Sequence, residues 1–85
     1  MQWLSEREAL FLKEIAKKGR VRLADLQYLG SSSTIYTTIK LLEARKLVKK
    51  GVDDSGFRVA ELTEKGKKVA ELIEEIEKEL DGDEN

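Results

Sequence analysis

One face of a stretch near the middle of the chain carries hydroxyls, an aromatic ring and an ammonium group. At about 100° per residue, Ser33, Tyr36, Thr37 and Lys40 fall together on one side of a helix, opposite its apolar residues. Such groups suit a surface that approaches phosphates and base edges closely. Because Ser and Thr are weak helix formers, their presence favours a binding surface, although a merely solvated helix face has the same appearance.

The chain lacks the residue types on which most catalysis depends. It contains no Cys and no His, which removes disulfides, thiol chemistry, histidine general bases and the common zinc sites. Adjacent carboxylates occur only at Asp53-Asp54 and in the Glu-rich last stretch, where a solvated surface explains them. We therefore expect no enzyme, no metal site and no cofactor.

The charge is unevenly distributed along the chain. Residues 1–60 hold twelve Lys or Arg against seven Asp or Glu, a net +5, whereas residues 61–85 hold four against ten, a net −6. This asymmetry predicts an anion-binding body with the last stretch turned away from it, the alternative being a lysine-rich surface that only confers solubility.

No apolar run is long enough to span a bilayer and no signal peptide is visible, so we expect a soluble, cytoplasmic protein.

Helix start and stop signals define the first elements. Ser5-Glu6-Arg7-Glu8 has the form of a capping box, which predicts a helix from about Glu6. Gly19, preceded by two lysines, is a suitable end for this helix. A brief extended segment at 20–22 and a short helix over 23–29 follow.

The middle of the chain changes from helical to extended periodicity. Ser31 is predicted to cap a helix over 31–47, because a Ser side chain accepts hydrogen bonds from free N–H groups at a helix start. Residues 48–52 and 57–62 read as strands, and the turn composition of residues 53–56 joins them. The sequence therefore predicts a two-stranded hairpin.

The last helix is predicted to mediate dimerisation. Thr63 can cap it, and its apolar residues recur over about two heptads, a seam too short to associate without help from the first helix. Eighty-five residues make one small domain, for which a dimer adds buried area. We divide the chain into a body at 1–62, a dimerisation helix at 63–80 and a frayed acidic tail at 81–85. The residues predicted at the interface are Val69, Leu72, Ile73, Ile76, Leu80, Trp3 and Phe11.

The order helix, short strand, helix, turn, helix, hairpin, helix resembles the winged helix-turn-helix domains of PadR-like and MarR-like transcriptional regulators. The run from Ser33-Thr34-Ile35-Tyr36 to Leu41-Leu42-Glu43 is similar to their recognition helix, and Leu62-Thr63-Glu64-Lys65-Gly66 is similar to the motif that closes their wing. The resemblance implies a mainly α (α+β) fold. It has a three-helix core, a two-stranded β-wing and an extra C-terminal helix for dimerisation.

The resemblance also implies a homodimeric transcription regulator that binds double-stranded DNA. Its recognition helix, 31–47, would enter the major groove and its wing, 48–62, would contact the backbone. The implied DNA-binding residues are Ser32, Ser33, Tyr36, Thr37, Lys40, Lys49, Lys50, Arg58, Arg20 and Arg22. Two alternatives remain: a winged helix that binds another protein, and a sequence-indifferent, chromatin-like DNA binder. Whether a small-molecule effector exists is left open.

This chain departs from the family pattern at three places. Asp53 and Asp54 occupy a wing tip that is basic in MarR-like proteins, which predicts a short wing or one held off the duplex by repulsion. The outer face of the recognition helix has no arginine for a bidentate contact to guanine. Lys46 stands where many relatives end this helix with a glycine.

Overall fold

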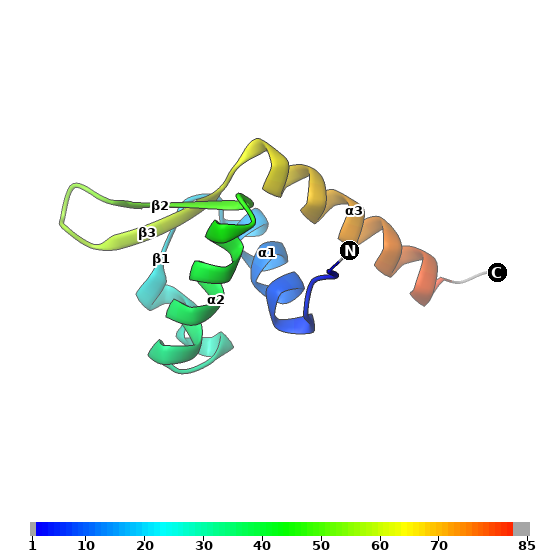
Figure 1. The fold of residues 1–85 in the computed structure, drawn as a ribbon, viewed down its shortest axis with the longest axis horizontal. Coiled ribbons are helices and arrows are strands. Elements are labelled where there is room, and N and C mark those ends of the chain that lie inside the picture. Colours follow the sequence, from blue (N-terminus) through cyan, green and yellow to red (C-terminus); the bar gives the residue numbers. More distant parts are fainter. Residues whose placement is uncertain (1, 83–85) are drawn as a thin grey trace.

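The computed structural model describes residues 2–82 (Figure 1). In chain order the elements are α1 (Glu6–Lys18), β1 (Val21–Arg22), the 3₁₀ helix η1 (Leu23–Leu29), α2 (Ser32–Ala44), β2 (Val48–Val52), β3 (Arg58–Leu62) and α3 (Glu64–Asp81). The wing formed by β2 and β3 projects at one end of the molecule, and α3 extends toward the other end. This order confirms the predicted winged helix-turn-helix.

The α-helices begin at the residues that the capping signals predict. The Ser5 side chain accepts a hydrogen bond from the Glu8 amide, and the Glu8 side chain accepts one from the Ser5 amide, which completes the capping box. Ser31 accepts from the amide of Thr34 at the start of α2. Thr63 accepts from the amide of Gly66 at the start of α3. Side-chain oxygens thus satisfy N–H groups that have no partner within each helix.

The sheet has three strands in the order β1-β3-β2, one more than the predicted hairpin. The two residues of β1 pair antiparallel with β3, in the register Val21 to Ala60 and Arg22 to Val59. The predicted extended segment is therefore a strand, β1, whose backbone groups pair with β3 of the wing. This pairing joins the wing to the part of the chain that leads directly into η1. The short helix predicted over 23–29 is present, but as a 3₁₀ helix.

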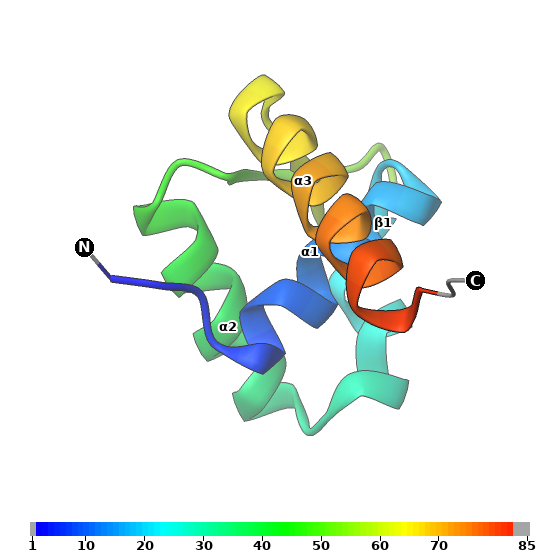
Figure 2. The ribbon, with the colours of Figure 1, turned by 90° about the vertical axis from the view of Figure 1, so that its right-hand side faces the viewer.

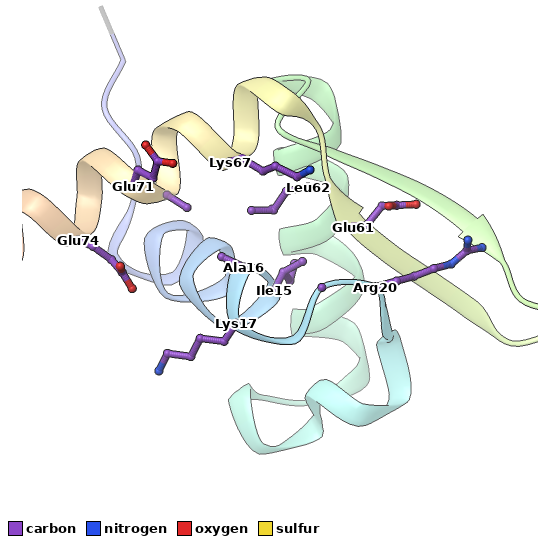
Figure 3. Close-up of a pocket in the computed structure, with 11 residues that line it drawn as sticks. Ile15, Ala16, Lys17, Arg20, Glu61, Leu62, Lys67, Glu71 and Glu74 are labelled. Carbon is purple, nitrogen blue, oxygen red and sulfur yellow. The ribbon is translucent and has the colours of Figure 1, made fainter.

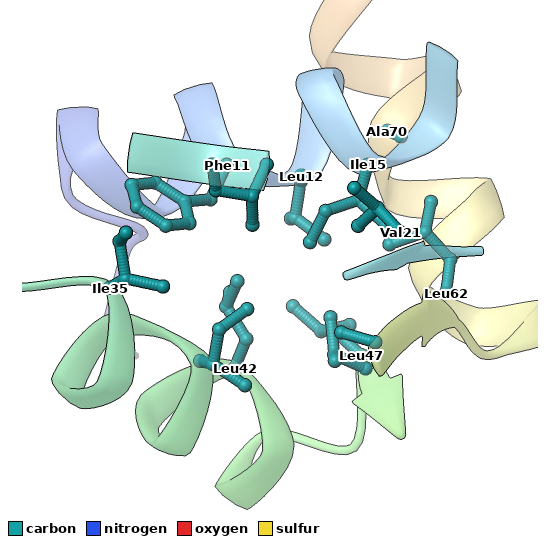
Figure 4. Packing of buried hydrophobic residues seen from close by; sticks show 13 residues of the cluster. Phe11, Leu12, Ile15, Val21, Ile35, Leu42, Leu47, Leu62 and Ala70 are labelled. Atoms are coloured by element: carbon teal, nitrogen blue, oxygen red, sulfur yellow. The ribbon is translucent and has the colours of Figure 1, made fainter. Parts of the chain in front are cut away.

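The core lies between α1, η1, α2 and the sheet. Figure 2 shows α1 between α2 and α3, and Figure 4 shows the apolar side chains meeting in the interior. Phe11, predicted at the dimer interface, is fully buried in this core and is unavailable to a partner. The prediction for Phe11 is wrong because the broad apolar surface of α1 packs on several elements of its own chain.

The helix predicted over 31–47 ends earlier than expected, since α2 stops at Ala44 rather than at Leu47. Lys46 has a φ of 64°, in the left-handed region that glycine favours. Its amide donates to the Glu43 carbonyl, and the Leu47 amide donates to the Leu42 carbonyl. Lys46 therefore takes the helix-ending conformation that a glycine adopts more easily.

The start of α3 is fixed against the segment that follows α2. The amide of Thr63 donates to the Leu47 carbonyl at 3.0 Å, and the Thr63 hydroxyl donates to the Lys46 carbonyl at 2.7 Å. A Cβ atom at Gly66 would overlap the Leu47 carbonyl oxygen. This close approach explains why the run Leu62-Thr63-Glu64-Lys65-Gly66 ends in glycine in this chain.

Among residues 2–82, no helix combines the length and apolar character needed to cross a membrane. Asp81 is the last residue of α3. The remainder of the predicted acidic tail, from residue 83, lies outside the described residues.

Candidate nucleic-acid interface

The Tyr36 ring on α2 lies near three cations. The Lys40 ammonium is 5.7 Å from the ring centroid, the Lys50 ammonium is 5.3 Å away, and the Arg58 guanidinium carbon is 5.5 Å away. Lys50 also forms an ion pair with Glu43, at 3.3 Å. Four of the residues predicted from sequence, two on α2 and two on the wing, are therefore brought together around one aromatic face.

The register of the wing determines which of its charges lie near α2. Lys50 is opposite Ala60 and Val52 is opposite Arg58, so Lys50 and Arg58 share one face of the sheet. Lys49 is opposite Glu61 and lies on the other face. The structure therefore separates Lys49 from the cluster around Tyr36, although Lys49 is adjacent in sequence to Lys50, which belongs to that cluster.

The hydroxyl-rich face of α2 is exposed beside this cluster. Ser32, Ser33 and Thr37 are exposed, whereas Thr38 is buried and donates to the Thr34 carbonyl at 2.7 Å. The exposed hydroxyls and the cations together form a surface of hydrogen-bonding groups and positive charge on α2 and the wing. Such a surface is suited to phosphate and base-edge contacts.

Two further predicted DNA-binding residues, Arg20 and Arg22, contact the wing. The Arg20 guanidinium donates to the Val52 carbonyl at 3.4 Å, and Figure 3 shows its side chain reaching toward β2. The Arg22 Nε donates to Asp53 at 2.7 Å, and its guanidinium carbon lies 4.2 Å from the centroid of the Phe57 ring. Arg20 and Arg22 thus hold the wing in place.

The wing-tip carboxylates differ from each other. Asp53 accepts hydrogen bonds from the Phe57 and Ser55 amides and from Arg22, which lower the pKa of its carboxyl group despite partial desolvation. Asp54 is exposed. Sequence reasoning treated the two as equivalent sources of repulsion. The signal it missed is the Asp-x-Ser-Gly composition, typical of a turn in which Asp bonds to later amides.

A hollow of about 520 Å³ lies between the end of α1 and the first half of α3 (Figure 3). Its apolar floor includes Ile15, Leu62 and Ala70. Charges of both signs line it: Lys17, Arg20, Lys67, Glu61, Glu71 and Glu74. Because the carboxylates offset the cations, this hollow is poorly suited to an anion. Among the described residues, no group of three or more carboxylates is placed to hold a metal ion.

The residues predicted at the dimer interface separate into two groups on α3. Val69 and Ile73 are partly buried against the core of their own chain. Leu72 and Ile76 are 45% and 44% exposed, and Leu80 is 80% exposed. Trp3 is also exposed, and Arg45 donates to its carbonyl oxygen at 3.2 Å. An exposed apolar stripe, formed by Leu72, Ile76 and Leu80, therefore runs along α3.

Solved structures with the same fold are transcription regulators. MepR, a transcription regulator of the Staphylococcus aureus multidrug efflux pump MepA, superposes with a TM-score of 0.84 at 21% identity over 92% of this chain and 61% of MepR. The transcriptional regulator SlyA superposes with 0.83 at 22% identity over 92% and 58% of the two chains, and BldR from Sulfolobus solfataricus with 0.80 at 26% over 91% and 58%. A MepR variant, similar to this chain at a TM-score of 0.83 and 19% identity, has been solved bound to an oligodeoxyribonucleotide.

These likenesses define the class of fold as the winged helix of MarR-type regulators. This chain spans about three fifths of the length of the regulators that it matches. No protein-family model and no curated protein matches its sequence.

Proposed function

We propose that this protein is a DNA-binding transcriptional regulator that acts as a homodimer in the cytoplasm and has no catalytic role. The observation that carries the proposal is the cluster in which Tyr36 and Lys40 of α2 meet Lys50 and Arg58 of the wing. One surface thereby combines the recognition helix with the wing. The oligonucleotide-bound MepR variant supports the proposal, because it has the same fold.

In this proposal α2 enters the major groove and the wing follows the backbone. Ser32, Ser33 and Thr37 bond to phosphates and base edges, while Lys40, Lys50 and Arg58 neutralise phosphates. Lys49 contacts a phosphate only where the duplex reaches the other face of the wing. Because no arginine lies on the outer face of α2, sequence preference depends on short hydroxyls, Tyr36 and DNA shape.

The dimer forms through the exposed stripe of α3. Leu72, Ile76 and Leu80 pack against the partner, with Val69 and Ile73 at the edge of the contact and Trp3 nearby. A two-fold pair would place the two recognition helices about 34–36 Å apart, one turn of DNA.

The charge along α3 favours antiparallel pairing of the two copies. Its first turns carry Lys65, Lys67 and Lys68, whereas residues 71–81 carry six carboxylates and one lysine. An antiparallel arrangement sets the basic half of each helix against the acidic half of its partner. A parallel arrangement would bring the acidic halves together.

The test is fluorescence anisotropy of a labelled duplex pool at several salt concentrations. We expect binding that weakens steeply with salt, and weaker binding with a salt slope lower by about 1 for Lys40→Ala and for Arg58→Ala. Lys78→Ala is the matched control, since it removes one exposed lysine from the far end of α3. Equal losses in all three variants would indicate nonspecific attraction, and no binding at low salt would reject the proposal.

A second candidate, a protein-interaction module, is favoured by one observation. Leu41 is 51% exposed on α2, beside a helix face that has no arginine. This candidate predicts that DNA binding is absent at low salt and that Leu41→Ser weakens a protein complex. Similar affinity for unrelated duplexes would instead support a sequence-indifferent DNA binder.

A further inference from the structure

We propose that Asp53 and Arg22 form a latch that holds the wing in its DNA-binding position, so that an acidic side chain at the wing tip strengthens DNA binding. Asp53 is thus a positioning residue, acting through Arg22 and the wing and not by contact with DNA. The inference rests on the proposed DNA-binding function. From its negative charge alone, Asp53 would be expected to weaken DNA binding, whereas the latch predicts that it strengthens binding.

The Asp53 carboxylate is occupied by three donors. Oδ1 accepts from the amides of Ser55, at 2.9 Å, and Phe57, at 3.0 Å, while Oδ2 accepts from the Arg22 Nε, at 2.7 Å. The backbone of Asp53 also bonds to Phe57 and Gly56, which closes the turn. The carboxylate therefore faces its own wing and the β1 strand, and its negative charge is compensated within the protein.

Arg22 connects the wing tip to the helix-turn-helix. It is the last residue of β1, directly before η1, and it pairs with Val59 in the ladder. Its guanidinium lies against the Phe57 ring while its Nε holds Asp53, so one side chain contacts both ends of the wing loop. Arg20, two residues earlier, adds a hydrogen bond to Val52. The wing is thereby anchored to the strand that leads into η1.

The end of the wing has little other support. Val52 is 62% exposed and Phe57 is 49% exposed, so packing alone fixes this part of the hairpin weakly. Arg58, next to Phe57, and Lys50 are the wing residues that lie over Tyr36. A latched wing presents Arg58 and Lys50 already ordered. A released wing would lose conformational entropy when DNA binds, and this cost would weaken the affinity.

Two neighbouring substitutions with the same change of charge test the latch. Asp53→Asn and Asp54→Asn each remove one negative charge from the wing tip, but only the first removes the charged partner of Arg22. We expect Asp54→Asn to bind a duplex about twofold more tightly and Asp53→Asn to bind about two- to fivefold more weakly. Tighter binding by both variants would overturn the latch while leaving the DNA-binding function intact.

A double-mutant cycle and a measurement without DNA complete the test. In the Asp53→Asn variant, the added substitution Arg22→Gln should change DNA affinity less than Arg22→Gln does alone, because both residues act through one contact. In the free protein, the NMR signal of the Arg22 Nε–H should be protected from exchange and lose that protection in Asp53→Asn. Independent effects in the cycle, or unchanged protection, would overturn the latch. Absence of DNA binding by the unsubstituted protein would reject the proposed function instead.

Discussion

Arg45, just beyond the end of α2, donates a hydrogen bond from its Nε to the buried carboxylate of Glu8 in the first turn of α1, at 3.1 Å. The same guanidinium donates to the carbonyl oxygens of Gln2 and Trp3, so that it holds the N-terminal segment against α2. Glu8 in turn completes the capping box with Ser5. One half-buried ion pair therefore joins the start of α1 to the end of α2.

Glu8→Gln should destabilise the fold by about 1–2 kcal/mol at neutral pH, because it keeps the cap acceptor but removes the charge that faces Arg45. Burial raises the pKa of Glu8, but the Ser5 hydrogen bonds and Arg45 outweigh it, so the pKa of the Glu8 carboxyl is lowered. A lowered folded-state pKa stabilises the fold above the unfolded-state pKa, and this contribution disappears as the pH falls through the folded-state value. Urea denaturation of both proteins should therefore differ at pH 7 and converge in acid.

The matched control for Glu8 is Glu6→Gln, which changes an exposed carboxylate in the same turn. It should change stability by less than about 0.5 kcal/mol. A stability difference between the Glu8 variant and the unsubstituted protein that stays constant down to acidic pH would contradict the role given to the Glu8 charge.

Lys46→Gly should stabilise the protein by about 0.5–1 kcal/mol, because glycine adopts the left-handed conformation without the steric cost that lysine bears. Lys46→Ala removes the same side chain but keeps the Cβ atom, so it should give little gain. Thermal unfolding of the two variants separates the backbone effect from the loss of charge. A larger gain for alanine than for glycine would contradict this explanation.

Gly66→Ala should destabilise the protein by about 3 kcal/mol or more, because the added methyl group would overlap the Leu47 carbonyl. Gly51→Ala is the control, since the nearest atoms to its Cβ are side-chain atoms at 3.6 and 3.7 Å, an ordinary contact distance. We expect a change of less than about 1 kcal/mol there. Chemical denaturation measures both, and a mild effect at Gly66 would show that α3 shifts easily.

Tyr36→Phe should retain most DNA affinity, whereas Tyr36→Leu should weaken binding by about fivefold, because only the aromatic ring attracts the three surrounding cations. Anisotropy titrations at one fixed salt concentration measure the difference. Equal losses in both variants would assign the role of Tyr36 to its hydroxyl and not to its ring.

Ile76→Glu should convert the proposed dimer to a monomer, because it places a charge in the exposed apolar stripe of α3. Glu75→Ala, at the neighbouring exposed position, should leave the dimer intact. Analytical ultracentrifugation gives both masses. This substitution is preferable to removing α3, because Ala70 is buried and Gly66 packs on Leu47 within one chain. A dimer that survives Ile76→Glu would contradict the proposed interface.

Local signals in the sequence predicted local structure well. Ser5, Ser31 and Thr63 cap their helices as expected, because a cap depends on residues only three positions apart. Contacts between distant residues were not predictable in this way. The ion pair of Arg22 with Asp53 spans 31 positions, and no periodicity specifies it. For the same reason, apolar spacing on α1 did not distinguish a core position such as Phe11 from an interface position.

The spatial grouping of the candidate binding residues was only partly predictable, for a related reason. The helical period correctly grouped the exposed residues of α2, but the wing charges depend on strand register, which assigns Lys50 and Lys49 to opposite faces. The end of α2 was missed because Lys46 adopts a conformation that a lysine rarely takes. Each discrepancy arises where tertiary contacts or an unusual backbone angle override a local preference.

The contact between Gly66 and Leu47 fixes the start of α3 just beyond the end of α2, and Ala70 and Ile73 pack the next turns of α3 on the core. Over its 18 residues, a helix is about 27 Å long, so a tilt of about 10° at its start displaces its far end by about 5 Å. Successive base pairs are about 3.4 Å apart. In a dimer of the proposed kind, the firmness with which Gly66, Ala70 and Ile73 hold α3 on its own chain would therefore decide whether the two halves of the protein tolerate an operator that is one base pair longer or shorter.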